Sequence, residues 1–180
     1  IWLRCRGQLM RDPEGDPALF AGIMTPLGRQ NKVDPLTQLL NRSQFVNDLN
    51  RMMKEDMVEQ MAVMVLDVDS FRRINEVFDR KFGDQMLKDL GRIILGILPG
   101  NAALYRMEKD KMGVILENGS AEECMELYRA IQKTLKNLRE WRQNKVTVGI
   151  SGGCAMYPAD GVTVDELCRY ADYALQYAKS

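Results

Sequence analysis

The run MAVMVLDVD, residues 61–69, constrains the fold of this chain more than any other stretch. Its apolar residues are continuous but too few for a long helix, so the run predicts a β-strand that ends in two carboxylates. An apolar strand of this kind needs covering elements, which must come from the segments on either side of it.

The segments around this strand alternate between helical and strand-like patterns. Phe45, Leu49, Met52 and Met53 recur at helical spacing before it. After it come a helical region, a hairpin at residues 105–116, a further helix, a strand and a last helix. This order predicts an α+β domain in which helices cover one central sheet.

Local signals predict where several of these helices begin and end. The pairs Ser120–Glu123 and Thr163–Glu166 are capping boxes that open the last two helices. The stretch KFGD, residues 81–84, predicts a break between two helical pieces, with Gly83 and Asp84 in the turn. The helix after Ser120 carries an apolar stripe, which consists of Cys124, Leu127, Ile131, Leu135 and Leu138.

The N-terminal part of the chain has a different character. Residues 1–25 form two strand-like segments around the turn sequence RDPEGDP, which predicts a β-hairpin. Residues 26–33 are a short polar linker, and the main domain covers residues 34–180. Because an isolated hairpin is marginally stable, we expect it to complete a sheet that lies mostly outside this sequence, which we interpret as an excised fragment.

Composition excludes several classes of function. Lys and Arg together number 25, as do Asp and Glu, so there is no basic excess to favour a nucleic-acid partner. The chain has no histidine, which excludes His-based triads and His-ligated zinc. Its four cysteines are scattered, and we expect them to be reduced. No run is long enough to span a membrane, so we expect a cytoplasmic domain without membrane contact, whose parent protein is free to be membrane-anchored.

Carboxylates are the remaining candidates for metal binding. Asp67 and Asp69 leave the end of the apolar strand on the same face, and such a pair can hold Mg²⁺ while substrate phosphates complete its shell. The alternative is that Asp69 and Ser70 only cap the helix that follows. Asp110, at the tip of the 105–116 hairpin, supplies a further carboxylate if the hairpin lies beside the strand end.

Several segments in order resemble the GGDEF domains of the diguanylate cyclase family. The matching stretches are DPLTQLLNR, LDVDSFRRIN, FGDQML, VTVGISGG, YPADG and ADYALQYAK, which run from Asp34 to the end of the chain. The resemblance implies a largely antiparallel five-stranded central sheet with helices on both faces. Residues 7–22, GQLMRDPEGDPALFAG, resemble the last hairpin of a PAS sensor domain, so the resemblance implies a bacterial sensor protein with a PAS domain before the GGDEF domain.

The family signature R-x-G-G-D-E-F falls on the hairpin tip. Arg106 and Asp110 match it, whereas Glu108 and Lys109 stand at the two glycines and Lys111 at the acid. Glycines let the backbone approach a nucleotide with no Cβ in the way, so these replacements predict a degenerate turn. The family's product-inhibition motif would fall on residues 99–102, PGNA, which lacks its charged residues.

The resemblance also implies a role for individual residues. In the family, two chains each present one GTP, and the two nucleotides are joined into cyclic di-GMP with the help of Mg²⁺. The implied metal ligands are Asp67, the carbonyl group of Val68, and Asp110. The implied substrate contacts are Asn75 and Asp84 for guanine, Lys179 for phosphate, and Arg72 at a position where the family has Lys. An Arg partner of Lys179 would lie beyond Ser180.

Three functions remain open. The chain is a degenerate GGDEF module that binds GTP without turnover, an active diguanylate cyclase, or a dimerisation or docking module with an empty site. Mg²⁺ is expected only with a bound nucleotide. We further expect an ammonium group from Lys111 or Lys109 to sit among Asp67, Asp69 and Asp110 in place of the metal, or else both lysines to point into solvent.

Overall fold

The computed structural model describes residues 3–26, 32–55, 57–137, 141 and 146–180. The chain divides into two units, residues 1–32 and residues 33–180, each with its own internal contacts. The strands are β1 Leu3–Arg11, β2 Pro17–Pro26, β3 Leu40–Asn41, β4 Met61–Val68, β5 Ala102–Arg106, β6 Lys111–Glu117 and β7 Ile150–Tyr157. The helices are α1 Arg42–Lys54, α2 Phe71–Val77, α3 Arg80–Leu95, α4 Ala121–Asn137 and α5 Val164–Lys179.

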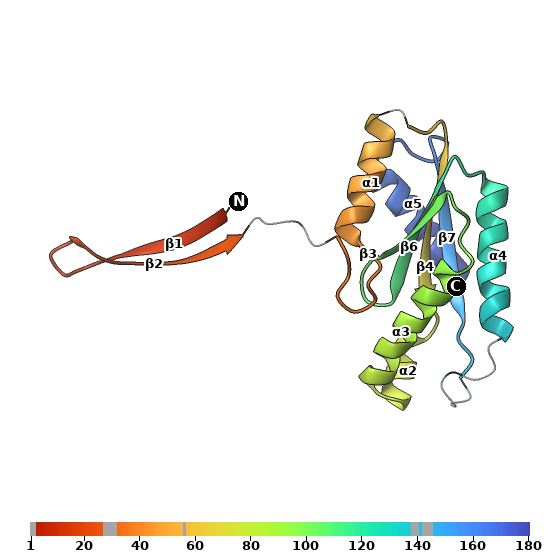
Figure 1. Cartoon of the computed structure of the whole chain (residues 1–180), viewed down its shortest axis with the longest axis horizontal. Helices are drawn as coiled ribbons and strands as arrows, with labels where there is room; N and C mark the ends of the chain where they lie inside the picture. The colour runs from red at the N-terminus through yellow and green to blue at the C-terminus, as the bar shows by residue number, and fades with distance from the viewer. Residues whose placement is uncertain (1–2, 27–31, 56, 138–140, 142–145) are drawn as a thin grey trace. The chain divides into compact units, whose positions relative to one another are not determined.

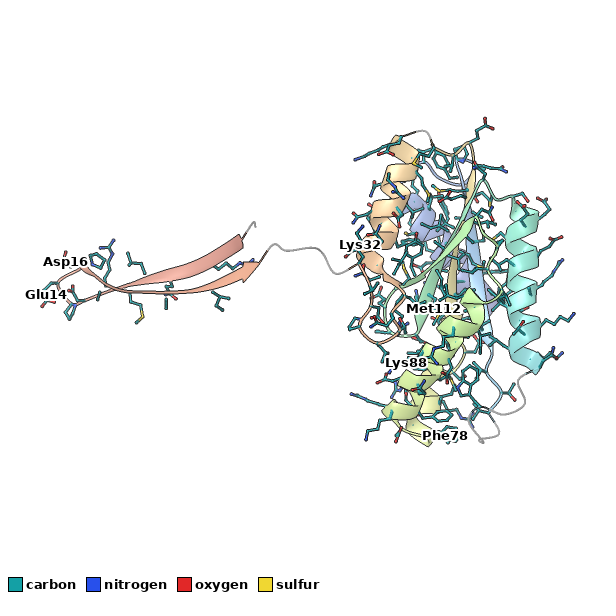
Figure 2. All side chains as sticks on the ribbon, in the orientation of Figure 1. Glu14, Asp16, Lys32, Phe78, Lys88 and Met112 are labelled. Atoms are coloured by element: carbon teal, nitrogen blue, oxygen red, sulfur yellow. The ribbon has the colours of Figure 1, made fainter. Side chains whose placement is uncertain are left out.

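The first unit is the hairpin that the sequence predicts. Strands β1 and β2 pair in antiparallel fashion over their length (Figure 1). Asp12 organises the turn: its carboxylate accepts a hydrogen bond from the backbone of Asp16, and its carbonyl accepts one from Gly15, which has a positive φ of 93°. Figure 2 shows Glu14 and Asp16 at this turn. The assignment of the hairpin to a PAS domain stays a prediction, and residues 27–31 of the predicted linker lie outside the described residues.

The second unit is built on one five-stranded sheet in the order β3-β5-β6-β4-β7. Only β3 runs parallel to its neighbour, and the other three pairings are antiparallel. The prediction of a largely antiparallel five-stranded α+β sheet is therefore confirmed. The central strand is β4, the apolar run at residues 61–69, which pairs with β6 on one side and β7 on the other.

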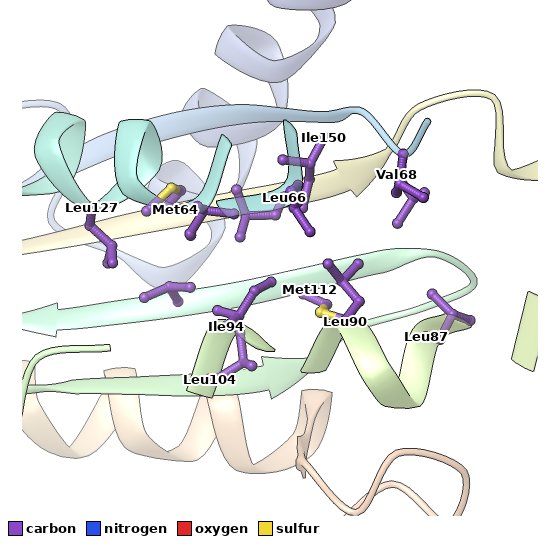
Figure 3. Packing of buried hydrophobic residues seen from close by; sticks show 14 of the residues in the cluster. Met64, Leu66, Val68, Leu87, Leu90, Ile94, Leu104, Met112, Leu127 and Ile150 are labelled. Atoms are coloured by element: carbon purple, nitrogen blue, oxygen red, sulfur yellow. The ribbon is translucent and has the colours of Figure 1, made fainter. Parts of the chain in front are cut away.

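Helices cover both faces of this sheet, and alternate residues of β4 contribute to the two cores (Figure 1). Ala62, Met64, Leu66 and Val68 pack toward α2, α3 and α4. Figure 3 shows part of this core, in which Leu87, Leu90 and Ile94 of α3 lie near Leu104 and Met112 and in which Leu127 of α4 and Ile150 of β7 lie near β4.

The opposite face of the sheet is covered by α1 and α5. Met61, Val63 and Val65 of β4 pack there against an apolar cluster from the two helices, which consists of Phe45, Leu49, Met52, Leu167, Ala171 and Leu175. Continuing the same alternation, Asp67 leaves β4 on the face that α5 covers. This alternation decides which helix can reach the carboxylates.

The helix boundaries correct one prediction. KFGD does not break the helical region, because α3 already begins at Arg80, and Gly83 and Asp84 lie inside it. The break comes earlier, at Asp79, whose carboxylate accepts a hydrogen bond from the backbone N–H of Phe82 and caps α3. Gly83 is needed for another reason: a Cβ there would lie 2.0 Å from Oδ1 of Asn75 in α2.

Both predicted capping boxes are confirmed. Ser120 and Glu123 exchange hydrogen bonds before α4, as do Thr163 and Glu166 before α5. The stripe of α4 is buried as predicted from Cys124 to Leu135, and Leu138 lies outside the described residues. Among the described residues, no helix is long and apolar enough to cross a membrane.

Candidate functional site

The candidate site lies where β4 ends beside the tip of the β5–β6 hairpin. The register pairs Asp67 with Lys111, the first residue of β6, so the hairpin tip is held next to the strand end as expected. Asp110 is close enough to hydrogen-bond the Asp67 carboxylate, and burial together with the charge of Asp67 raises the pKa of Asp110. Two ionised carboxylates that approach this closely repel one another, and a nearby cation relieves the repulsion.

A lysine does stand among these carboxylates, but it is not one of the two that were expected. Lys179, at the end of α5, places its ammonium group 2.5 Å from Asp67 Oδ1 and 4.0 Å from Asp69 Oδ1. Its charge lowers the pKa of Asp110 and so opposes the effect of Asp67. The Asp67 side chain is only 14% exposed, so this ion pair is partly shielded from water.

The expectation that Lys111 or Lys109 occupies this place is therefore wrong, and the alternative that both lysines point into solvent is wrong for Lys111. The ammonium group of Lys111 binds the Asp172 carboxylate of α5 at 2.6 Å. Lys109 is exposed. The physical reason is the position of α5: Asp172 lies within reach of the start of β6, while the end of the same helix delivers Lys179 to Asp67.

Asp69 is held by β7 rather than used as a helix cap. Its carboxylate accepts a hydrogen bond of 2.6 Å from the hydroxyl group of Ser151, and its backbone N–H donates to the carbonyl of Gly149. Ser70 occupies the cap position of α2 but makes no side-chain capping bond. The alternative that Asp69 and Ser70 only cap α2 is not supported, and Asp69 remains available at the edge of the site.

The hairpin tip keeps a backbone shape that suits glycine. Lys109 has a φ of 53°, in the left-handed region that favours glycine, although it carries a long side chain. The turn is closed by two backbone hydrogen bonds, from Met107 to Lys111 and from Lys111 to Glu108. Glu108 and Lys109 are both exposed at the tip of the hairpin.

Arg106 braces this turn, a role that sequence reasoning did not assign to it. Its guanidinium group donates to the backbone carbonyl of Lys111 at 2.9 Å, and the residue is only 7% exposed. Burial lowers its pKa, whereas the charges of Asp34, Asp110 and Asp84 raise it. In the sequence, the only indication of this role was that Arg106 matches the arginine of the family signature. The fold adds that three carboxylates lie near its guanidinium group.

The predicted guanine contacts lie on α2 and α3. Asn75 Oδ1 is buried and has no hydrogen-bond partner among the described residues, where it faces Gly83 of α3. Asp84 follows Gly83 and is exposed, and it is close enough to Arg106 for its charge to act on that group. Arg72 is not brought to the carboxylates; it points into solvent and pairs with Glu76 along α2.

An open cavity of about 590 Å³ borders Asp69 between α4 and the start of β7. Arg129, Lys133 and Lys136 of α4 line it together with Asp69 and Gly149. The site is thus bordered by positive charge on the α4 side, in addition to Lys179 from α5.

The donor set suits a hard cation only in part. Asp67, Asp110 and the carbonyl group of Val68 offer oxygen atoms, which Mg²⁺ prefers. Burial, and after it the charge of Asp67, raises the pKa of Asp110, so a bound cation would relieve part of the repulsion between the two carboxylates. Within the described residues, however, no three acidic, Cys or His side chains gather at metal-ligand spacing. Mg²⁺ would therefore need further oxygen atoms from a phosphate or from water, and Lys179 competes with it for Asp67.

Comparisons with known proteins give a consistent result. Residues 31–180 match the family described as diguanylate cyclase, GGDEF domain. Probable diguanylate cyclase DgcT of Escherichia coli strain K12 is 29% identical over 151 residues, which are 81% of this chain and 33% of that protein. The chain thus spans about a third of the length of this relative.

Solved structures show the same fold. The GGDEF domain of TpbB (YfiN) from Pseudomonas aeruginosa is similar with a TM-score of 0.75 and 28% identity, covering 82% of this chain and 88% of that one. The GGDEF domain of DgcB from Caulobacter crescentus, crystallised in complex with c-di-GMP, has a TM-score of 0.74 and 22% identity, with coverage of 86% and 91%. The second likeness bears on the fold alone.

Proposed function

Since this chain belongs to the diguanylate cyclase GGDEF family, we propose that it is a signalling domain that binds GTP as a regulatory ligand and does not join two GTP molecules into cyclic di-GMP. In this proposal the nucleotide lies at the end of β4, with its phosphates near Asp67, Asp110 and Lys179 and its base near Asn75 and Asp84.

The proposal that the chain does not synthesise cyclic di-GMP rests on the hairpin tip. Lys109 holds a left-handed backbone conformation in which a side chain costs free energy, on the order of 1 kcal/mol. Glu108 and Lys109 put two long side chains where a glycine pair would leave the backbone open to a nucleotide. Glu108 also adds a negative charge near the position proposed for the phosphates. Lys111, at the position of the signature acid, is engaged by Asp172 and brings no carboxylate to the site.

Retention of nucleotide binding is supported by the groups that remain at the end of β4. Asp67 and Asp110 converge there, and Mg²⁺ bound by a triphosphate would receive from the phosphates the oxygen ligands that no third acidic side chain among the described residues supplies at metal-ligand spacing. When bound, Mg²⁺ would neutralise the phosphates and the two carboxylates. Lys179 is an ammonium group that can move from Asp67 to a phosphate oxygen. The buried amide oxygen of Asn75 has no hydrogen-bond partner in the part of the chain that the structure describes, and a donor on a guanine edge is a group that would satisfy it.

The proposed setting is a larger bacterial sensor protein. The hairpin of β1 and β2 would be the end of a PAS domain that passes its signal to the GGDEF domain, and the GGDEF domain would be cytoplasmic. Two chains would have to meet for cyclic di-GMP synthesis, so a homodimer is compatible with the proposal but not required by it.

Calorimetric titration of the chain with GTP and Mg²⁺ tests the binding half of the proposal, and chromatography of a long incubation tests the other half. We expect saturable GTP binding that Asp67→Asn weakens at least tenfold, with no cyclic di-GMP. Asp12→Asn, in the separate N-terminal unit, is the control that leaves binding unchanged. Cyclic di-GMP above background would instead show an active cyclase, and absence of GTP binding would indicate a docking module with an empty site.

A gain-of-function variant sharpens the test. Glu108→Gly, Lys109→Gly and Lys111→Glu together restore the signature turn, and this is the smallest set expected to allow turnover. If the triple variant binds GTP no better than the natural chain and makes no product, the turn is not the element that blocks the reaction.

A further inference from the structure

A pair of cysteines meets on the face of the sheet that α4 covers, away from the signature hairpin. Cys124 of α4 and Cys154 of β7 place their sulfur atoms 2.8 Å apart, although they are far apart in sequence. Both are free thiols in this structure. We propose that Cys124 and Cys154 are a redox-active dithiol that hydrogen peroxide converts into a disulfide, which links α4 to β7.

The packing of α4 against β7 makes this contact specific. At Gly152 an added Cβ would lie 2.8 Å from the ring of Tyr128, so the missing side chain lets α4 approach the strand closely. Tyr128 is fixed there by a hydrogen bond from its hydroxyl group to the carbonyl of Ile150. The helix is thus held against the strand at a point next to the two thiols.

The spacing along both elements then brings the thiols together. Cys124 lies four residues before Tyr128 on the same face of α4, a rise of about 6 Å. Cys154 lies two residues after Gly152 on the same face of β7, a rise of about 6.6 Å. These steps match, so a helix that is close to the strand at Gly152 must also bring Cys124 to Cys154.

A small oxidant has a route to the pair. A cavity of about 390 Å³ is lined by both cysteines, by Tyr128 and by Met125, which is 48% exposed at the surface. Cys124 itself is buried, and the cavity gives a molecule as small as hydrogen peroxide access to it. Contact with Cys154 lowers the pKa of Cys124, whereas contact with Cys124 and burial raise the pKa of Cys154, so Cys124 ionises first.

The chemistry is a balanced two-electron oxidation. The Cys124 thiolate attacks one oxygen atom of hydrogen peroxide, the O–O bond breaks, and a sulfenic acid forms as hydroxide leaves. Cys154, after losing its proton to solvent, attacks the Cys124 sulfur; the S–S bond forms, the S–O bond breaks, and a second hydroxide leaves. The two thiol protons convert the two hydroxide ions to water. A dithiol reductant such as dithiothreitol reverses the link by thiol–disulfide exchange.

Peptide mapping by mass spectrometry after peroxide treatment tests the proposal on the natural chain. We expect one cross-linked peptide pair that joins Cys124 to Cys154, with the loss of two hydrogen atoms, and its disappearance after dithiothreitol. The closed loop of about 30 residues should raise the midpoint of thermal unfolding by roughly 5–10 °C relative to the reduced chain. Free thiols at both positions after treatment, or oxidation to sulfinic acid without a link, would overturn the proposal.

Two variants separate the pair from the other cysteines. Cys168→Ser, on α5, should leave the cross-link and the thermal shift unchanged, whereas Cys154→Ala should abolish both. The mapping on the natural chain needs no substitution. It therefore tests the proposal even if the Cys154→Ala variant folds poorly. A cross-link that persists in Cys154→Ala would show that Cys124 pairs elsewhere.

Discussion

Replacing Lys179 by Met should destabilise the domain at neutral pH by removing the only ammonium group that the described residues place on Asp67. The exposed fractions, 34% for the lysine side chain and 14% for Asp67, lie between those of surface and buried pairs. Surface pairs contribute about 0–1 kcal/mol, and breaking a buried pair costs about 3–5 kcal/mol. We therefore expect a loss of about 1–2 kcal/mol in the free energy of unfolding.

The loss of stability in Lys179→Met should depend on pH, because Lys179 affects the pKa of Asp110. The folded chain raises the pKa of Asp110 above its ordinary value of about 3.9. This group therefore contributes stability that is full below the ordinary pKa and is lost as pH rises through the folded pKa. Lys179 lowers that folded pKa, so its removal raises the pKa further. The difference between Lys179→Met and the natural chain should thus be largest at pH 7 and shrink toward pH 4.

Urea unfolding followed by circular dichroism, in the presence of EDTA, measures both effects. With a slope of about 2 kcal/mol per molar urea, the expected loss shifts the midpoint by about 0.5–1 M at pH 7. Lys54→Met at the end of α1 is the matched control, because this lysine is exposed and does not line the site. Equal midpoints for Lys179→Met and the natural chain, with equal pH dependence, would refute the placement of Lys179 among the carboxylates.

Three further substitutions test the surroundings of the site by urea unfolding. Tyr105→Phe removes a buried hydrogen bond of 2.9 Å to Asp48 and should cost about 1–2 kcal/mol; no change would show that Asp48 is satisfied by its other partners. Gly83→Ala should cost about 1–3 kcal/mol and weaken GTP binding, because its Cβ would overlap Asn75; unchanged stability and affinity would exclude this close contact. Lys111→Glu should cost about 1 kcal/mol, because it places an acid beside Asp172 of α5, and adding Asp172→Lys should restore stability. If the double variant is no more stable than Lys111→Glu, the ion pair is not present.

The architecture was predictable because the sequence is locally consistent. The apolar run at 61–69 alternates sides once it is placed in a sheet, and the two capping boxes mark helix starts without ambiguity. The break between α2 and α3 was misplaced because Gly83 was interpreted as a turn residue. Its actual role is the close approach of two helices, and that requirement is a property of packing that no local pattern carries.

The site was predictable only in part. The residues alone left open whether the hairpin tip lies beside the end of the apolar strand, and the pairing of Asp67 with Asp110 came from the family resemblance. The sheet register does place the hairpin tip there. Two interactions could not be read from the sequence: Lys179 with Asp67 spans 112 positions, and Lys111 with Asp172 spans 61. Both interactions depend on how α5 is oriented on the sheet, and the contacts of α5 with β4 and β7 set that orientation. The buried position of Arg106 depends likewise on the arrangement of three distant segments.

The arrangement of charges has a consequence for the proposed function. Without a ligand, the Asp67 carboxylate already binds the ammonium group of Lys179, and burial together with the charge of Asp67 raises the pKa of Asp110. Mg²⁺ alone would have to displace Lys179 from Asp67, and it gains only two carboxylates and a carbonyl in return. A triphosphate changes this balance, because it offers Lys179 a new anion and offers the metal further oxygen atoms. Nucleotide and metal would therefore bind together, and a chain of this kind would respond to Mg-GTP rather than to either component alone.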